Sequence, residues 1–524
     1  MKSTAGLAAA LALYVATSGA MAAPKTIRAV MQADLGILDP VITTGTITAD
    51  HGAMVYDTLF GIDTDLKPQP QMVGRTVVSD DKLTWTFTLR DGLLWHDGGP
   101  VTAKDCVASI RRWAQRDSSG ARLMSKTAAL EVIDDHTFRF VLKEPFGMVP
   151  DILAKTSTPV PYMMRERDAM TDANTPIKEV IGSGPFRFVA SERVAGSQTV
   201  YERNPAYVPR SEPPNGFAGG KIVKVDRVVW TVIPDAQTAV DALLRNEIDF
   251  YETPPSDLLP MLKKSPNVKL QVLDRLGNQV LLRMNQLQPP FDNPKARQAM
   301  LLLVRQEDYM GAIVGDPDYY RICGALFVCG SPMENDANMD WLTHHNVERA
   351  KQLFKEAGYD GRKIVVLQPV DYLAYSNAAE VTVGLLREAG VNAELATSDW
   401  GTLLARRSNR GPVDKGGWNI FHTGTAGNGA ANPILNTWLA TTGASANVGW
   451  PTDARNEELR DQWAKTDSLD ERKRIAREIQ QNAYDFVPYI PLGVTLVPVA
   501  YRTSLSGFVP VSGIVPFWGV DKDE

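Results

Sequence analysis

The sequence predicts an α/β fold with two lobes and a ligand cleft between them. At 524 residues the chain is too long for one ordinary hydrophobic core, so we expect more than one domain. Strand, helix and strand follow one another over 225–250 and again over 347–395, an order that favours open α/β sheets. The chain passes from the first region to the second and back, and two such crossings form a hinge that allows closure on a ligand.

The first residues predict export from the cytoplasm. Lys2 gives a short basic start, residues 7–16 are apolar but too few to span a bilayer, and Ala20-Met21-Ala22 supplies small residues for cleavage. We therefore expect a signal peptide at 1–22, with a buried N-terminal helix as the alternative. No cysteine lies at the cleavage point, so the mature chain is expected in the periplasm without a lipid anchor.

Composition and cysteine spacing narrow the class of protein. A hydrophobic fraction of 44% and a charged fraction of 22% are typical of a soluble globular protein, and a net charge of −6 argues against nucleic acid as a partner. Cys323 and Cys329 flank a short loop, and in an oxidising compartment we expect them to form a disulfide. Cys106 lies on the apolar side of a predicted helix and is expected to be buried.

The first lobe is expected to contain a core of residues 23–52, 180–277 and 488–524, with an extra α+β subdomain at 53–179. In that subdomain Trp85, Phe87 and Leu89 alternate with polar residues, which predicts a half-buried strand. Thr102 and Asp105 have the spacing of a capping box at the start of a helix.

The second lobe is expected at 278–487. It opens with a strand at 279–285, and Asn293-Pro294 predicts the start of a helix. Helices and strands then alternate, and the chain is expected to return to the first lobe near Val487–Pro491. The further predicted elements are helices at 347–357, 378–389, 400–407 and 469–484 and strands at 364–367, 391–395 and 418–421.

Several separated motifs resemble those of the extracellular solute-binding proteins of ABC importers, family 5, the peptide and nickel type. The motifs are Leu282-Arg283-Met284-Asn285, Pro290-Phe291-Asp292-Asn293-Pro294, Arg297-Gln298-Ala299-Met300, Trp95-His96-Asp97-Gly98 and Ile181-Gly182-Ser183-Gly184-Pro185-Phe186. The resemblance implies a monomeric receptor of the type II fold that binds a small solute without a cofactor and delivers it to the importer's transmembrane permease subunits.

The candidate ligand-binding residues lie mainly after the predicted strand 418–421, because ligands in α/β sheets gather at the carboxyl ends of strands. Glycines there would let the backbone approach a ligand; a flexible surface loop is the alternative. Tyr372 and Tyr375 could stack on a ligand, and Arg283 could pair with a carboxylate or form an internal ion pair. The full candidate set is Thr43, Gly45, Thr46, Arg283, Asn285, Tyr372, Tyr375, Trp418, His422, Thr423, Gly424, Thr425 and Asn428.

One departure from the family pattern bears on the ligand. In peptide-binding members the resembling loop carries an aspartate that pairs with the ligand's α-amino group, whereas no acidic residue occurs here between Asp414 and Asp453. A buried ammonium without a carboxylate is costly. Opine-like, sugar-type or otherwise modified amino-acid ligands therefore compete with peptides.

Catalytic and metal motifs are missing from the sequence. It contains no Gly-x-Ser-x-Gly, His-Glu-x-x-His, paired-cysteine zinc or Walker motif, so we expect no enzyme. We predict no metal site; a nickel chelate remains an alternative ligand, with His422 as the one supporting histidine. A periplasmic hydrolase or sensor on the same fold stays open as a different class.

Overall fold

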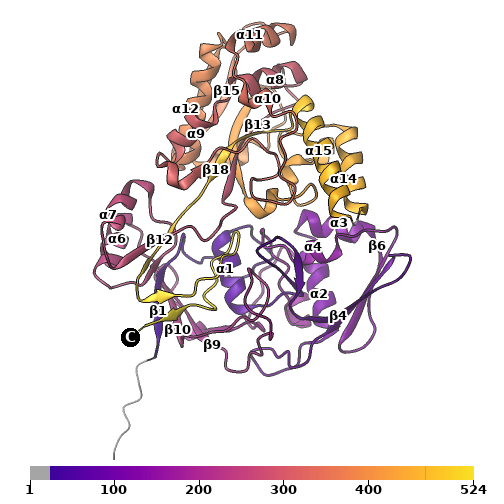
Figure 1. The fold of residues 1–524 in the computed structure, drawn as a ribbon, viewed down its shortest axis with the longest axis vertical. Helices are drawn as coiled ribbons and strands as arrows, with labels where there is room; N and C mark the ends of the chain where they lie inside the picture. Colours follow the sequence, from indigo (N-terminus) through magenta and orange to yellow (C-terminus); the bar gives the residue numbers. More distant parts are fainter. Residues whose placement is uncertain (1–23, 467, 524) are drawn as a thin grey trace, which may run out of the picture.

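The structure, a computed structural model, describes residues 24–466 and 468–523, which form two lobes stacked along the long axis of the molecule (Figure 1). The indigo-to-magenta first lobe lies below the orange-to-yellow second lobe, and the yellow C-terminal segment returns to the first. The predicted signal peptide at 1–22 falls outside the described residues. Among those described, no helix is both long and apolar enough to cross a membrane.

The first lobe is organised around a seven-stranded sheet. The strand β1 (Thr26–Val30) pairs in parallel with β10 (Arg227–Thr231) and β11 (Phe250–Tyr251). The remaining strands are antiparallel to their neighbours: β8 (Phe186–Phe188), β9 (Gln198–Arg203), β12 (Val268–Gln271) and β19 (Val499–Arg502). Its helices are α1 (Thr46–Val55), α6 (Ala236–Leu244) and α7 (Leu259–Lys263).

An additional four-stranded antiparallel sheet extends the first lobe. Its strands, in spatial order, are β4 (Val73–Val78), β5 (Thr84–Leu89), β7 (Thr137–Leu142) and β6 (Thr127–Val132). It is accompanied by α2 (Ala103–Trp113), α3 (Ser118–Lys126), α4 (Val149–Leu153) and α5 (Glu166–Ala169). Phe87 and Leu89 of β5 are buried as the alternation predicts, and the capping box of Thr102 and Asp105 opens α2.

The second lobe is built on a six-stranded sheet with β13 (Asn278–Met284) inside it. The spatial order is β14 (Tyr320–Arg321), β18 (Ile490–Thr495), β13, β17 (Ile420–Ala426), β15 (Ile364–Pro369) and β16 (Ala393–Ser398). The helices are α8 (Pro294–Leu303), α9 (Gln306–Ile313), α10 (Asp340–Thr343), α11 (Val347–Glu356), α12 (Leu373–Glu388), α13 (Trp400–Arg406), α14 (Ala454–Lys465) and α15 (Leu469–Phe486).

Two short antiparallel pairs lie outside the three larger sheets. The strands β2 (Phe60–Ile62) and β3 (Pro68–Pro70) form one pair, and β20 (Leu505–Ser506) and β21 (Asp521–Lys522) form another.

The chain crosses between the lobes through two neighbouring segments. The first joins β12 to β13 over 272–277, and the second joins β18 to β19 over 496–498. The predicted return near residue 488 is wrong, because Ile490–Thr495 pairs with β13 and still belongs to the second sheet. At Gly277, which has a φ of 63°, a Cβ would lie 2.3 Å from the carbonyl oxygen of Thr495, so the two crossings are packed against each other.

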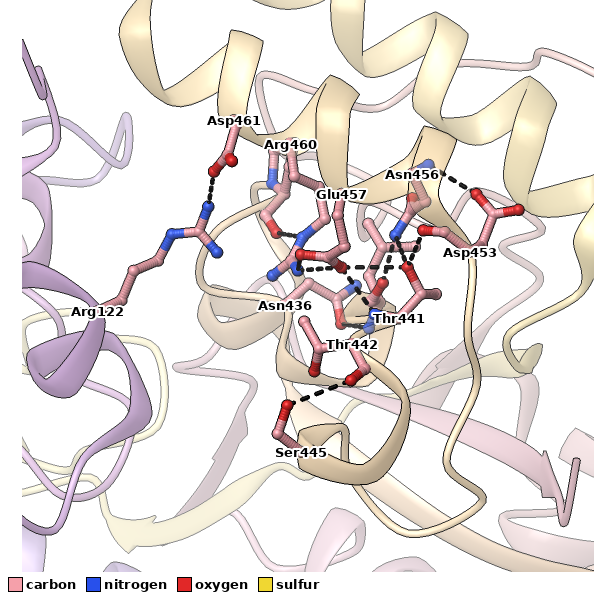
Figure 2. A network of polar contacts seen from close by, with 12 residues as sticks. Arg122, Asn436, Thr441, Thr442, Ser445, Asp453, Asn456, Glu457, Arg460 and Asp461 are labelled. Atoms are coloured by element: carbon pink, nitrogen blue, oxygen red, sulfur yellow. Dashed lines mark hydrogen bonds and ion pairs between the residues drawn. The ribbon is translucent and has the colours of Figure 1, made fainter. Parts of the chain in front are cut away.

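The lobes also meet away from the crossings, where α14 lies against the additional subdomain. Figure 2 shows Arg122 of α3 reaching across to the carboxylate of Asp461 on α14. Nearby, Lys465 Nζ lies 3.0 Å from Glu144 Oε2, and the Gly147 amide donates to the Ala464 carbonyl at 3.3 Å. These interlobe contacts, which we call the α14 contact, describe a closed arrangement.

The expected disulfide and the buried cysteine are both present. Cys323 and Cys329 are bonded at an S–S distance of 2.08 Å, which confirms the pairing predicted from the short loop between them. Cys106 is fully buried on α2. Burial raises the pKa of the Cys106 thiol well above its ordinary value, as expected for an unreactive core residue.

Arg283, a candidate ligand residue, is instead part of the core of the second lobe. Its side chain is fully buried on β13, and its guanidinium donates to the carbonyl oxygens of Trp438, Asn447, Val448 and Pro488 at 2.7 to 3.3 Å. Because burial disfavours the charged form, the pKa of Arg283 falls to about 9. The donors of Arg283 are therefore used to hold together chain segments that are distant in sequence.

Replacing Arg283 by methionine tests this structural role. We expect Arg283→Met to lower the free energy of unfolding by about 3 kcal/mol, because buried carbonyl oxygens lose their donors. Chemical denaturation of the mature chain measures the loss, and Arg245→Met at an exposed arginine is the matched control. Equal stability of the two variants would contradict the assignment.

Candidate ligand-binding site

A cavity of about 570 Å³ lies between the two lobes. The first lobe contributes Gln32 and Glu252, the additional subdomain contributes residues 116–119 and 155–159, and the second lobe contributes the end of β17. Both crossings also reach the cavity, through Asp274 and Val497. The cavity is thus bounded by segments of both lobes and by both crossings.

The cavity wall is rich in hydroxyl groups, which alternate with aliphatic side chains. No aromatic side chain lines it among the residues that the structure describes. Hydroxyls can donate and accept hydrogen bonds at once, so such a wall suits a ligand with several polar groups. The lining hydroxyls include Thr44, Thr46, Ser118, Ser119, Thr156, Thr253, Thr425 and Thr437.

The end of β17 supplies the second lobe's share of the wall. The strand continues to Ala426 rather than ending at Phe421, because residues 420–426 pair along the whole of β13. Gly424 and Thr425 are therefore strand residues that open onto the cavity. A Cβ at Gly424 would lie 2.9 Å from the Tyr375 hydroxyl oxygen, so the glycine lets this tyrosine pack closely, whereas the sequence suggested close approach to a ligand.

The loop that follows β17 is held in place by α14. Arg460 of α14 donates to the Pro433 carbonyl at 2.9 Å and to the Glu457 carboxylate at 2.7 Å. Glu457 in turn accepts from the Thr441 amide at 2.7 Å, within the network drawn in Figure 2. Leu435 and Thr437, which lie between these anchors, line the cavity.

Asn428 bridges the lobes at the edge of the cavity. Its Nδ2 donates to Thr156 Oγ1 at 2.5 Å and to the Ser512 carbonyl at 3.2 Å, both in the first lobe. The Oδ1 atom of Asn428 is buried and has no hydrogen-bond partner among the described residues. Asn428 therefore holds the lobes together through its Nδ2 atom, whereas its Oδ1 atom makes no hydrogen bond within the described residues.

Some of the sequence-predicted residues are brought to the cavity and others to its border. Thr46, Gly424 and Thr425 line it. Thr43 and Gly45 stand beside it, where Thr43 Oγ1 accepts from the Gly45 amide at 3.0 Å and Gly45 precedes the first turn of α1. Thr44, which the sequence analysis did not select, is the residue of this loop that lines the cavity together with Thr46.

Further candidates are core residues away from the cavity. The Asn285 side chain donates to the Trp418 carbonyl, and Trp418 Nε1 donates to the Arg407 carbonyl. His422 and Thr423 are buried, and His422 Nε2 lies 2.8 Å from Thr382 Oγ1. Burial lowers the pKa of His422 to about 3. His422 and Thr423 lie on the part of β17 that is buried on both faces, and none of these four residues lines the cavity.

Tyr372 and Tyr375 form an aromatic cluster with Trp400 beyond the carboxyl end of β15. The two tyrosine rings stack with centroids 4.5 Å apart, and each lies 5.4 Å from the Trp400 ring. Tyr372 is 44% exposed. The rings pair with one another and neither tyrosine belongs to the cavity lining.

Charged groups missed by the sequence analysis face the cavity from the first lobe. Asp117 and Lys155 form a buried ion pair in its wall, with Arg116 exposed beside them. Glu252 accepts from the Gln32 amide at 2.8 Å and from Gln32 Nε2 at 3.1 Å. Burial raises the pKa of Glu252 to about 7 and also raises the pKa of Asp274. Glu252 directly follows β11, so its position at the carboxyl end of a strand could have marked it in the sequence as a candidate ligand contact.

The described residues contain no cluster of side chains suited to hold a metal ion. Within residues 24–466 and 468–523, no three His, Cys, Asp or Glu side chains are placed to hold a metal ion together.

Comparisons with known proteins agree on one family. Residues 67–446 match the profile described as "Bacterial extracellular solute-binding proteins, family 5 Middle". A probable peptide ABC transporter periplasmic-binding protein of Sinorhizobium fredii is 49% identical over 99% of this chain and 98% of its own length. A glutathione-binding protein of Salmonella typhimurium is 27% identical over 99% of this chain and 97% of its own.

A solved structure shows the same fold. The binding protein AgaA, in complex with agropinic acid from A. tumefaciens R10, superposes with a TM-score of 0.77 at 21% identity. The superposition covers 95% of this chain and 99% of AgaA. With two lobes, paired crossings and a cavity between them, the chain belongs to the bacterial extracellular solute-binding proteins, family 5.

Proposed function

We propose that this protein is the periplasmic receptor of an ABC importer and encloses a peptide or another amino-acid-derived solute in the interlobe cavity. The observation that carries the proposal is the cavity itself, which takes its wall from both lobes and from both crossings. A ligand bound there contacts parts that separate when the lobes open, so its binding energy favours closure. The closed form then presents the solute to the permease subunits.

The proposed class of ligand is supported by the names of similar proteins and by the residues of the loop after β17. The 49% identical relative is named for peptides and a more distant one for glutathione, which is itself a modified peptide. The loop after β17 lacks the acidic residue expected for ordinary peptide binding. An opine-like ligand is the second candidate, because that missing acid removes the expected amine anchor and the structurally similar AgaA holds agropinic acid.

The proposal includes three further expectations about the mature protein. The segment 1–22 directs export and is removed, the receptor works as a monomer, and it releases its ligand chemically unchanged. Export agrees with the periplasmic name of the S. fredii relative. Against a hydrolase stands the sequence, which contains none of the Gly-x-Ser-x-Gly, His-Glu-x-x-His, paired-cysteine zinc or Walker motifs.

A thermal-shift screen tests the proposed function. The mature chain is heated with dipeptides, glutathione, agropinic acid, simple sugars or nickel with histidine. We expect an amino-acid-derived compound to stabilise the fold by about 2.7 kcal/mol at one hundred times its Kd. Mass spectrometry should recover the stabilising compound intact. Stabilisation by sugars alone, or conversion of the compound, would contradict the proposal.

A bulky residue at the end of β17 should obstruct the cavity. Thr425→Trp places an indole in the wall that Thr425 now forms, and we expect ligand affinity to fall about tenfold or more. Calorimetric titration measures the affinity. Thr343→Trp, at an exposed threonine of α10, is the matched control. Unchanged affinity in Thr425→Trp would place the ligand elsewhere.

The α14 contact should contribute to affinity without touching the ligand. Arg122→Ala combined with Lys465→Ala removes ion pairs made only in the closed arrangement. Since exposed pairs contribute up to about 1 kcal/mol each, we expect roughly fivefold weaker binding at low salt.

The control for this pair lies within the second lobe. Arg474→Ala combined with Lys351→Ala removes ion pairs that do not cross between the lobes, so ligand affinity should not change. Equal affinity of the two double variants would show that the α14 contact does not favour closure.

A further inference from the structure

Buried carboxylates in this protein are generally compensated by a cation. Asp39 lies 2.7 Å from Arg112, Asp57 lies 2.7 Å from Lys221, and Asp249 lies 3.0 Å from Arg28. In the cavity wall, Asp117 is paired with Lys155. These pairs follow the rule that a buried charge needs an opposite charge or several hydrogen bonds.

Hydrogen bonds compensate the buried carboxylates that have no cation. Asp105 accepts from the Thr102 amide and hydroxyl and from the Glu166 amide. Asp63 accepts from the Asp65 and Lys67 amides and from the Gln69 side chain. In each case both carboxylate oxygens are occupied.

Asp50 and Glu252 are compensated less completely. Asp50 is 0% exposed, its Oδ1 accepts from the Val515 amide at 2.9 Å, and its Oδ2 has no hydrogen-bond partner among the described residues. Glu252 is 6% exposed, and among the described residues its two carboxylate oxygens accept only from the amide and the side chain of the neutral Gln32. In the described part of the chain, neither carboxylate has a Lys, Arg or His within ion-pair distance.

The two carboxylates stand together in the first-lobe wall of the cavity. Glu252 and Gln32 line it directly. Asp50 lies on α1 one turn beyond Thr46, which lines the cavity, and its donor Val515 lines it too. Asp50 and Glu252 repel each other, which adds to the effect of burial in raising the pKa of Asp50. Burial and this repulsion favour the protonated forms, and ionisation would leave a negative charge in the wall that no Lys, Arg or His of the described residues neutralises.

We propose that Glu252, with Asp50 behind it, binds the cationic amino group of the solute. The inference rests on the proposed function and narrows its ligand to compounds that bear an ammonium or a similar cation. A bound ammonium would supply the positive charge that both carboxylates lack and a further hydrogen-bond donor. Amine recognition would then come from the first lobe, on the opposite side of the cavity from the loop after β17, where the sequence has no acid.

Binding of such a cation is linked to protons. With a pKa of about 7, Glu252 is partly protonated at neutral pH, and a cation binds its ionised form. Affinity should therefore rise as the pH rises from 5.5 to 7. The other charged groups facing the cavity are Asp274, Arg116 and the Asp117–Lys155 pair. A Glu252→Gln variant separates the contribution of Glu252 from theirs.

The test compares free and N-acetylated forms of the same probes, glutathione and the dipeptide Met-Leu, by calorimetric titration. We expect the wild-type chain to bind free amines, with affinity rising about tenfold from pH 5.5 to 7. Glu252→Gln should weaken binding of the free amines about tenfold or more and remove this pH dependence. Equal binding of the acetylated probes to wild type, or unchanged affinity in Glu252→Gln, would overturn the inference.

A control variant and a ligand-free measurement complete the test. Glu247→Gln makes the same charge change at an exposed site and should bind like wild type. Without ligand at pH 8, Glu252→Gln should have a Tm equal to or above that of wild type, because it removes an uncompensated charge. A Tm several degrees lower would show that Glu252 is structural and overturn the inference. If neither probe binds wild type, the thermal-shift screen still judges the proposed function, and the Tm comparison still judges the carboxylate pair.

Discussion

The close packing of the two crossing segments is the constraint on which the rest of the structure depends. Gly277 has no room for a Cβ beside the Thr495 carbonyl, so the segments 272–277 and 496–498 stay adjacent. Asp274 reinforces this point of the fold, because it accepts from the amides of Leu276 and Gly277 and from Ser512 and Gly513. Two linked connections on one side leave the opposite side free to open, and the cavity lies where the lobes face each other.

Local patterns in the sequence were sufficient for much of the fold. The alternation around Phe87, the capping box at Thr102 and the spacing of Cys323 and Cys329 each describe interactions between near neighbours, and all of them are present. The return to the first lobe was misplaced because the apolar run 490–495 fits a strand in either sheet. Its pairing with β13 decides the matter, and that pairing joins residues about two hundred positions apart in sequence.

The candidate site was harder to predict, because its charges come from separate parts of the chain. Thr425 could be found from its position after a predicted strand, whereas Asp117 and Lys155 meet only after the additional subdomain folds. Arg283 was misjudged for a related reason. A lone arginine on a buried strand looks like a ligand contact until the carbonyl groups around it are known. Burial and long-range contacts, which sequence periodicity does not report, separate structural from exposed polar residues.

The ion pairs of the α14 contact have a consequence for how the receptor responds to its surroundings. Arg122, Asp461, Lys465 and Glu144 retain partial access to water, so dissolved ions screen their attraction. The hydrogen bonds of Asn428 are buried and are much less sensitive to such screening. A rise in external ionic strength would therefore weaken the α14 contact alone and shorten the lifetime of the closed form. Ligand exchange would then be faster at high salt, while the crossing segments that form the hinge would not change.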